Sequence, residues 1–316
     1  MASVWDAFVR AGKNASFLFE RAYMDYHSDR FEDHSLLVFE GQRLVAVLPA
    51  NLTRDGHLQS HGGLTYGGLV FAGDERLANV LGVFRATLEY MQTVGIPSLH
   101  YRRIPRFYNP VPDDEVDYAL FLLKAELVRR DCALVVPLRH RLPYSKRRRR
   151  EISKARSSGI RVIEDANFTQ FWQRILTPRL QQRYGVNPVH SLEEITLLGE
   201  RFPQNIRQFS ALAADEIVAG ITIYETPVVA HVQYSAMSEA GQATGALDAI
   251  VDYLICERYA HKSYFDFGIS NEKAGLVLNH GLLDWKEGFG ARSAAHDFYL
   301  VDAGAYPLLD SALSSR

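Results

Sequence analysis

The sequence predicts an α+β protein made of two related halves, in which mixed sheets are flanked by helices. Pairs of alternating apolar segments are separated by two-residue polar turns, which is the pattern of β-hairpins. Longer segments follow in which apolar residues recur every three or four positions, as in amphipathic helices. The same order of segments occurs twice along the 316 residues, which indicates an internal duplication.

The first half opens with a predicted hairpin over residues 35–50, whose turn is formed by Gly41 and Gln42. The segments that follow predict a strand from residue 57, a helix over 75–94, a strand from 98, a second helix and a last strand from 133. Hairpins mixed with helical crossovers favour a mixed sheet over a doubly wound parallel one.

The second half repeats this order. Residues 210–225 align with 35–50 without a gap, and Asp215 and Glu216 are expected to form the turn. The segments that follow predict a strand from residue 231, a helix over 245–259, a strand from 263, a further helix and a last strand from 295. We place the boundary near residue 145, which gives one domain over 1–145 and another over 146–316.

Five consecutive cationic residues, 146–150, stand at the start of the second half. Apolar and basic residues around them recur at helical spacing, and Gly159 is a suitable left-handed end for a helix. We therefore expect a short cationic helix to open the second domain. Its exposed charges have three interpretations: a solvated surface, a contact for a phosphate-bearing substrate, or a nucleic-acid contact.

Composition excludes several classes of protein. A formal net charge of −2 and a pI near 6.6 disfavour a DNA-binding protein, whose surface is usually strongly positive. Cys132 and Cys256 lie in apolar segments and are expected to be buried thiols, without a disulfide or metal role. The histidines show no metalloenzyme spacing, so no metal is predicted. The absence of a long apolar run or a leader-like start favours a cytoplasmic protein without stable membrane insertion.

Four segments carry a resemblance to a known family. They are HGGLTYGGLV (61–70), KRRRREISKARSSGI (146–160), FDFGIS (265–270) and LNHGLLDWKEGFGAR (278–292). In these segments, and in its order of elements, nearly the whole chain resembles the tandem GNAT-fold acyltransferases, which include FemAB-like and BioF2-like acetyltransferases. The resemblance implies two GNAT-like domains and an enzyme that transfers an activated acyl group to an amine.

The resemblance also implies the substrates. The expected donor is acetyl-CoA or another acyl-CoA, and the expected acceptor is an amino-sugar-type precursor of a cell-surface polymer. Aminoacyl-tRNA is the alternative donor in the wider family, but its tRNA-dependent members commonly carry a long helical hairpin insert for which this chain has no room. A third interpretation is a non-catalytic GNAT pair that only binds a precursor or a partner.

By the same resemblance, a loop at a helix start would bind the pyrophosphate of coenzyme A through backbone N–H groups. Segment 241–247 matches this loop in part, which makes Gln242, Gly245 and Ala246 the candidate cofactor-binding residues. Leu247 stands where the family has a small residue, so the match is incomplete.

Four residues are candidates for catalysis. Lys286 matches a family lysine that is thought to offset negative charge at the transferring carbonyl, although a lysine in the last turn of a helix also suits the helix dipole. His231 and Tyr234 lie in the central strand, and alternation places them on opposite faces, with Gln233 on the face of His231. Asp266 ends a strand, where it would orient an amine or hydroxyl, or cap a turn.

Further residues are candidates for substrate binding. Asn279 is expected to share the helix face of Lys286. Neighbouring His280 and Glu287, His190 at a predicted helix entry, and Arg102 and Arg103 after a first-half strand complete the set. The two arginines would suit a phosphate or carboxylate.

Overall fold

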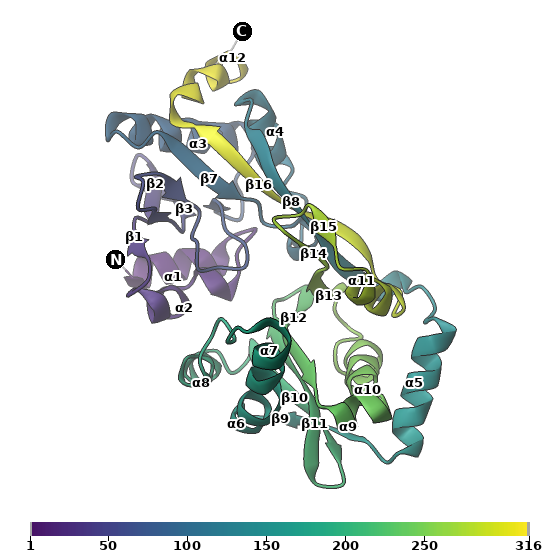
Figure 1. Cartoon of the computed structure of the whole chain (residues 1–316). Helices are drawn as coiled ribbons and strands as arrows, with labels where there is room; N and C mark the ends of the chain where they lie inside the picture. The colour runs from purple at the N-terminus through teal and green to yellow at the C-terminus, as the bar shows by residue number, and fades with distance from the viewer. Residues whose placement is uncertain (1, 315–316) are drawn as a thin grey trace. The chain divides into compact units, whose positions relative to one another are not determined.

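The computed structural model describes residues 2–314, and it confirms the predicted α+β class with mixed sheets flanked by helices (Figure 1). The chain forms two compact units. Unit 1 comprises residues up to 131 and from 295 onward, and unit 2 comprises residues 132–294. The functional argument below concerns mainly unit 2.

Within the described residues, unit 1 contains seven strands of its own and five α-helices. The strands are β1 (Glu32–Asp33), β2 (Leu36–Glu40), β3 (Arg43–Leu48), β4 (Asn51–Leu52), β5 (Leu58–Gln59), β6 (Val70–Phe71) and β7 (Ser98–Arg102). The helices are α1 (Ala2–Ala11), α2 (Arg21–Met24), α3 (Leu77–Thr93), α4 (Glu115–Leu122) and α12 (Asp310–Leu313), with short turns η1 (Phe17–Phe19), η2 (Asp25–His27), η3 (Arg106–Tyr108) and η7 (Ala303–Leu309).

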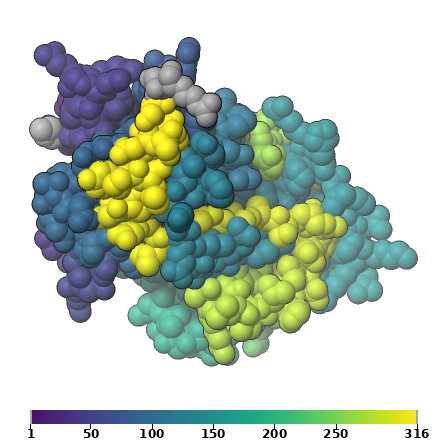
Figure 2. All heavy atoms as spheres, turned by 90° about the horizontal axis from the view of Figure 1, so that it is seen from above, coloured from purple at the N-terminus to yellow at the C-terminus, as the bar shows by residue number. Residues whose placement is uncertain are grey.

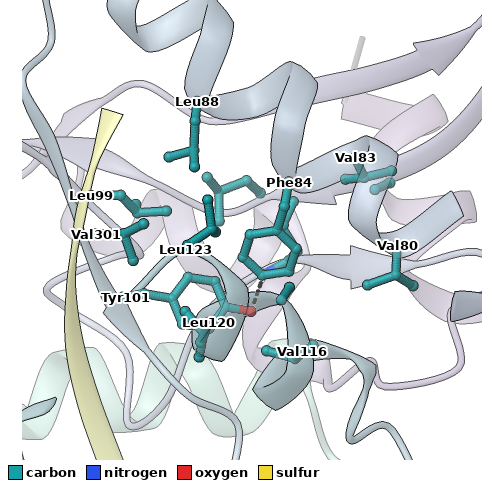
Figure 3. Packing of buried hydrophobic residues seen from close by; sticks show 14 of the residues in the cluster. Val80, Val83, Phe84, Leu88, Leu99, Tyr101, Val116, Leu120, Leu123 and Val301 are labelled. Atoms are coloured by element: carbon teal, nitrogen blue, oxygen red, sulfur yellow. Dashed lines mark hydrogen bonds between the residues drawn. The ribbon is translucent and has the colours of Figure 1, made fainter. Parts of the chain in front are cut away.

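The core of unit 1 lies between α3, α4 and the sheet. The apolar residues of α3 recur at helical spacing, so Val80, Phe84 and Leu88 all reach the core (Figure 3). Tyr101 on β7 is buried with them, and its hydroxyl oxygen accepts a hydrogen bond of 3.1 Å from the Leu69 N–H. This bond satisfies a phenol that would otherwise be costly to bury.

Unit 2 contains the long strands. They are β9 (Arg161–Asp165), β10 (Ile206–Ala213), β11 (Glu216–Glu225), β12 (Val229–Met237) and β13 (Tyr264–Ile269), with a small pair β14 (Asn271–Glu272) and β15 (Val277–Leu278). The helices are α5 (Lys146–Ser157), α6 (Thr169–Phe171), α7 (Thr177–Tyr184), α8 (Leu192–Arg201), α9 (Glu239–Thr244), α10 (Ala246–Tyr253) and α11 (His280–Glu287), with turns η4 (Leu138–His140), η5 (Trp172–Leu176) and η6 (Leu254–Arg258).

Helices cover both faces of the unit 2 sheet. Ile221 and Ile223 of β11 pack with Ile250 and other apolar residues of α10 on one face. Gly220, one position away, lets Phe171 approach closely on the other face, where a Cβ would come within 2.3 Å of its ring. The alternation of the strand thus assigns α5, α9 and α10 to one face and α6 to α8 to the other (Figure 1).

Two strands pass from one unit to the other along the chain. β8 (Glu126–Pro137) begins in unit 1, and its end pairs with β13 in unit 2. β16 (Arg292–Asp302) begins in unit 2, and its end pairs with β7 in unit 1, where yellow residues lie against blue ones in Figure 2. Each unit therefore takes one sheet strand from the other half of the sequence, and the units differ from the ranges 1–145 and 146–316 that we predicted as domains.

The duplication is visible in the hairpins, but the alignment of the second hairpin needs a correction. β2 and β3 turn at Gly41 and Gln42 as expected. β10 and β11 turn one residue earlier than predicted, at Ala214 and Asp215, and Ala214 adopts a φ of 53°. The gap-free alignment places Gly41 opposite Glu216, whereas the turn of the second hairpin begins at Ala214, so the alignment is shifted by two residues. Because side chains alternate with a period of two, this shift leaves the inward and outward faces unchanged, which hides it in the sequence.

The cationic helix is confirmed as α5. Ser145 caps its start by accepting a hydrogen bond from the Arg148 N–H, and Gly159 ends it with a φ of 70°. Arg148 points inward, where its guanidinium is paired with Asp248 of α10. The remaining cations of the run are exposed and form no ion pair with any described residue: Lys146, Arg147, Arg149 and Arg150.

Candidate active site

Two parallel strands separate at the centre of the unit 2 sheet. β12 and β13 pair over only three positions, and the last pair is His231 with Asp266. Beyond it β12 continues to Met237 beside β11, while β13 continues beside β8. Beyond His231, the edge of β12 that faced β13 therefore lies outside this ladder, and an extended ligand would hydrogen-bond to its N–H and C=O groups.

A histidine and a carboxylate meet where the strands separate. Asp266 Oδ2 lies 2.7 Å from His231 Nδ1, so the carboxylate accepts a hydrogen bond from Nδ1–H and the basic lone pair resides on Nε2. Asp266 Oδ1 accepts a bond of 2.7 Å from the Gly268 N–H. This turn has a φ of 70° at Gly268, which glycine adopts without strain. The carboxylate is therefore held in one orientation from both sides.

Lys286 joins this cluster from α11. Its ammonium donates to the carbonyl oxygens of Gly268 (3.0 Å) and Ile269 (2.6 Å), and its side chain is buried. Burial lowers the pKa of Lys286 from 10.5 to about 8, although the nearby charge of Asp266 opposes that shift. Three of the four candidate catalytic residues, His231, Asp266 and Lys286, thus come together around one turn.

The fourth, Tyr234, has a different environment, and its predicted face is wrong. The strand register pairs His231 with Tyr224 and Tyr234 with Thr222, so the two candidates lie on the same face of β12. The reason is a β-bulge in which Gln233 is the extra residue, which breaks the alternation that we assumed.

Tyr234 belongs to a buried cluster with His190. Its hydroxyl lies 2.5 Å from His190 Nδ1 and accepts from the His190 N–H, while Trp172 donates its indole N–H to the His190 carbonyl oxygen. Burial raises the pKa of Tyr234 to about 12. The pair fixes the loop before α8, where the predicted helix entry is present and Ser191 and Glu194 form a capping box.

A cavity of about 470 Å³ lies beside the separated part of β12. Its walls come from η5 and α7, the end of β12, the start of α10 and the start of α11. The lining residues are Leu176, Arg179, Leu180, Arg183, Tyr184, Ser235, Ala236, Met237, Leu247, Asn279, Gly281, Leu282 and Trp285. A mainly apolar cavity with a few polar groups is typical of a small-molecule site.

Our sequence reasoning missed Arg179, Arg183, Tyr184 and Trp285. A signal for the arginines is present in the sequence, because the segment 169–184 contains three arginines and no acidic residue. Such a helix lacks the pairing partners that usually accompany basic side chains on a solvated face. Only the fold shows that two of the three arginines border a cavity.

The expected coenzyme A loop takes a specific form. Residues 239–244 form the short helix α9. Gly245 ends it in the left-handed conformation, with a φ of 73°, and α10 begins at the next residue. Gly245 and Ala246 are buried, and a Cβ on Gly245 would lie 2.6 Å from the Glu151 carbonyl oxygen of α5. Gln242 is exposed, and Leu247 lines the cavity. The cofactor contacts of Gln242, Gly245 and Ala246 stay predictions.

The candidate substrate residues of α11 fall into two groups. Asn279 lines the cavity and caps the helix by accepting from the Leu282 N–H, while its amide donates to Glu272. His280 and Glu287 are exposed and do not line this cavity. Lys286 also does not line it, since its ammonium points to the carbonyl groups of Gly268 and Ile269 at the end of β13.

The two candidate arginines of unit 1 are engaged within that unit. Arg103 is buried and forms a two-point ion pair with Asp113, with Asp117 nearby. Arg102 donates to the Leu64 carbonyl oxygen and stacks over Phe298, and burial lowers its pKa to about 10. These contacts give both arginines a role in stabilising the fold of unit 1. Their role in substrate binding stays a prediction.

The remaining chemical candidates are few. Cys132 and Cys256 are free thiols, and Cys256 is exposed, contrary to our expectation of burial. Within residues 2–314 no three His, Cys, Asp or Glu side chains are grouped as metal ligands would be. In the same range, no helix combines the length and apolar character needed to cross a bilayer.

Comparison with known proteins identifies the fold. Neither a protein-family model nor a curated protein matches the chain. Among solved structures, FemX matches with a TM-score of 0.67 at 11% identity, over 99% of this chain and 98% of that one. The C-terminal domain of a putative lysylphosphatidylglycerol synthetase from Agrobacterium fabrum matches with a TM-score of 0.60 at 12% identity, over 98% and 93%. L-PGS from Bacillus licheniformis matches at 0.58 and 10%, over 93% and 96%.

These likenesses concern the fold alone, because the identities are low. They confirm the fold that the sequence resemblance implied, because this chain has the fold of FemX and of the synthetase domain. The coverage is close to complete in both directions, so the whole described chain corresponds to that fold.

Proposed function

We propose that this protein is an N-acyltransferase that moves an acyl group from acetyl-CoA, or another acyl-CoA, to an amine of a sugar-containing precursor of a cell-surface polymer. The observation that carries the proposal is the cluster of His231, Asp266 and Lys286 where β12 and β13 separate. Chemistry of this kind needs a base for the amine and a positive charge near the reacting carbonyl, and the cluster contains both.

His231 is assigned as the base. An amine attacks a thioester carbon only as its neutral form, so a proton must leave the nitrogen before or during attack. Asp266 holds the Nδ1 proton, which leaves Nε2 to take the proton of the amine. Asp266 also stabilises the imidazolium that forms, so its role is to position and support His231.

Lys286 is assigned the role of stabilising the thioester carbonyl oxygen of the donor. Attack places negative charge on the thioester oxygen, and a protonated amine in a dry site stabilises such charge strongly. The N–C bond forms, the C–S bond breaks, and the thiol leaves as the carbonyl is restored. With a pKa of about 8, Lys286 is mostly protonated at neutral pH. We expect the rate to fall as the pH rises above about 8.

We assign the donor to the place beyond His231 where β12 and β13 separate, and to the cavity beside it. An extended chain with amide groups, such as the pantetheine arm of coenzyme A, would complete the ladder of β12. Leu247 lies in the cavity wall, so it would meet the donor there.

Aminoacyl-tRNA is the second candidate donor. One structure of the same fold is named for lysylphosphatidylglycerol synthesis, a product that carries an aminoacyl group. The exposed cations at the start of α5 are the local observation that favours this donor, since tRNA binding depends on phosphate contacts. Binding of tRNA that weakens steeply with added salt would support this alternative.

Calorimetric titration with acetyl-CoA tests the proposal. Leu247→Arg, which places a long charged side chain in the cavity, is expected to weaken binding at least tenfold. Leu197→Arg is the matched control, because Leu197 is exposed on α8 and lines no part of this cavity. Absence of binding to the unchanged protein at millimolar acetyl-CoA would contradict the donor assignment. Equal binding by Leu247→Arg would contradict the assigned place.

A further inference from the structure

We infer that Arg179 and Arg183 form a binding site for the diphosphate group of a substrate whose organic part fills the cavity. The inference rests on the proposed function, and it adds the chemical class that this site recognises. Both arginines come from α7 and line the cavity.

The charges of these arginines are not neutralised by the protein. Neither forms an ion pair with a carboxylate among residues 2–314, whereas Arg148, Arg156, Arg207 and Arg258 of the same unit do. The cavity lining contains no aspartate or glutamate. Arg179 is half-buried, and a half-buried guanidinium without a partner is costly, while Arg183, which is exposed, repels it from the same helix face. An anionic ligand removes both costs.

The spacing of the two arginines suits two phosphoryl groups. Residues four apart lie on the same helix face, about 6 Å apart at Cβ. The guanidinium of Arg183 is also placed over the ring of Tyr184, 5.3 Å from its centre, which limits its directions. Guanidinium groups bind phosphate oxygens through paired N–H donors, so each arginine can hold one phosphoryl group.

The rest of the cavity fits an organic body attached to these phosphates. Leucine and methionine side chains form most of its other walls, from Leu176, Leu180, Met237, Leu247 and Leu282. The Trp285 ring is held in place by Phe267 and Phe289, at centroid distances of 5.4 and 5.5 Å. One wall is thus fixed and apolar, while the wall formed by α7 is cationic.

The start of α10 is the other obvious anion site of unit 2, since it would offer backbone N–H groups to a phosphate. Helix α5 packs against it: a Cβ on Gly245 would lie 2.6 Å from the Glu151 carbonyl oxygen, and Arg148 is paired with Asp248 in the first turn of α10. We therefore expect the diphosphate at the arginines of α7.

Three sources share this chemistry: coenzyme A on the donor side, and a nucleotide-linked or a polyprenyl-linked precursor on the acceptor side. Calorimetric titration of the full chain with coenzyme A, uridine diphosphate and farnesyl diphosphate distinguishes them. Pantetheine and uridine serve as phosphate-free counterparts. We expect at least one diphosphate to bind, and to bind at least tenfold more tightly than a phosphate-free counterpart.

Variants locate the site. Arg179→Ala and Arg183→Ala should each weaken the binding about tenfold, as expected for the loss of one charge-assisted contact. Arg183→Lys should recover only part of the affinity, because an ammonium lacks the paired donors. Arg174→Ala is the matched control, since Arg174 is exposed on the preceding turn and does not line the cavity, and it should change binding less than twofold.

Two binding results would overturn the inference, as would the kinetic result given last: no binding of any of the three diphosphates at millimolar concentration, or unchanged binding by both alanine variants. Failure of the proposed function gives a different result, in which the diphosphate binds through the arginines but no amine is acylated. Acyl transfer that is unaffected by either alanine variant, even at limiting substrate, would contradict the diphosphate site and leave the proposed function standing.

Discussion

Two histidines of unit 2, His231 and His190, were candidates for different roles and differ in their hydrogen bonds. His231 is bonded to a carboxylate, which fixes its tautomer and supports a positive charge on the ring. His190 is bonded to the phenol of Tyr234, which supplies no charge at neutral pH, since the pKa of that phenol is raised to about 12. Only His231 therefore has the surroundings of a base.

We predict that His231→Gln lowers kcat for acyl transfer by about 10² to 10⁴-fold, the usual contribution of a general base. Tyr234→Phe keeps the aromatic packing against Trp172 and should reduce kcat less than tenfold. Steady-state rates and the circular dichroism of both variants check this expectation. A larger loss of kcat in Tyr234→Phe than in His231→Gln would reverse the assignment.

The lowered pKa of Lys286 also predicts how the free energy of unfolding depends on pH. Its pKa is about 8 in the folded protein and 10.5 when exposed. Between these values the unfolded chain holds a proton that the folded chain has lost, so the free energy of unfolding rises with pH in this window. Below pH 8 the lysine is charged in both states, and its burial cost is fully present.

The rise amounts to about 3 kcal/mol at most for a shift of this size. Lys286→Met removes the titrating group, so its free energy of unfolding should lack this rise relative to the unchanged protein. Urea unfolding between pH 7 and pH 10.5 measures the difference. Parallel pH profiles for the two proteins would show that Lys286 is not buried as the structure has it.

The contact between α5 and α10 joins the start of unit 2 to its core. Two ion pairs connect the same helices and differ in burial. Arg148 and Asp248 are both buried, and burial raises the pKa of Asp248 despite its partner. Arg156 and Asp252 form the other pair, in which Arg156 is mostly exposed. This difference makes the two pairs a matched comparison on one interface.

We predict that Arg148→Ala destabilises the protein by about 3 to 5 kcal/mol, because it leaves a buried carboxylate without its partner. Arg156→Ala should cost about 0 to 1 kcal/mol, as exposed pairs do. Urea unfolding of both variants at pH 7 measures these values. Equal costs for the two variants would mean that the helix does not pack as described.

The exchange of strands concerns the chain as a whole. Unit 1 takes the end of β16 from the second half of the sequence, and unit 2 takes the end of β8 from the first half. A sheet that lacks such a strand exposes an apolar edge and loses a row of backbone hydrogen bonds.

We therefore predict that neither fragment 1–145 nor fragment 146–316 folds alone. Each should show broad amide signals by NMR, whereas mixing the two fragments should restore dispersed signals. Circular dichroism and gel filtration of the mixture provide a second check. A well-folded fragment 146–316 would show that β13 does not need the end of β8.

The sequence alone determined the class of fold, the duplicated order of elements, the cationic helix and the residues of the candidate cluster. These follow from local patterns, because periodicity and capping act within a few residues of each other. It also singled out Lys286 through a family resemblance, and His231 and Asp266 through their places in predicted strands, without showing that the three meet.

Only the tertiary structure decided how these residues are arranged. The bulge at Gln233 depends on pairing with β11, so alternation alone placed Tyr234 on the wrong face. The cover of α5 over Gly245, the arginine wall of the cavity and the exchanged strands all join segments far apart in the chain. Such contacts depend on which surfaces pack together, and no local pattern of residues encodes that choice.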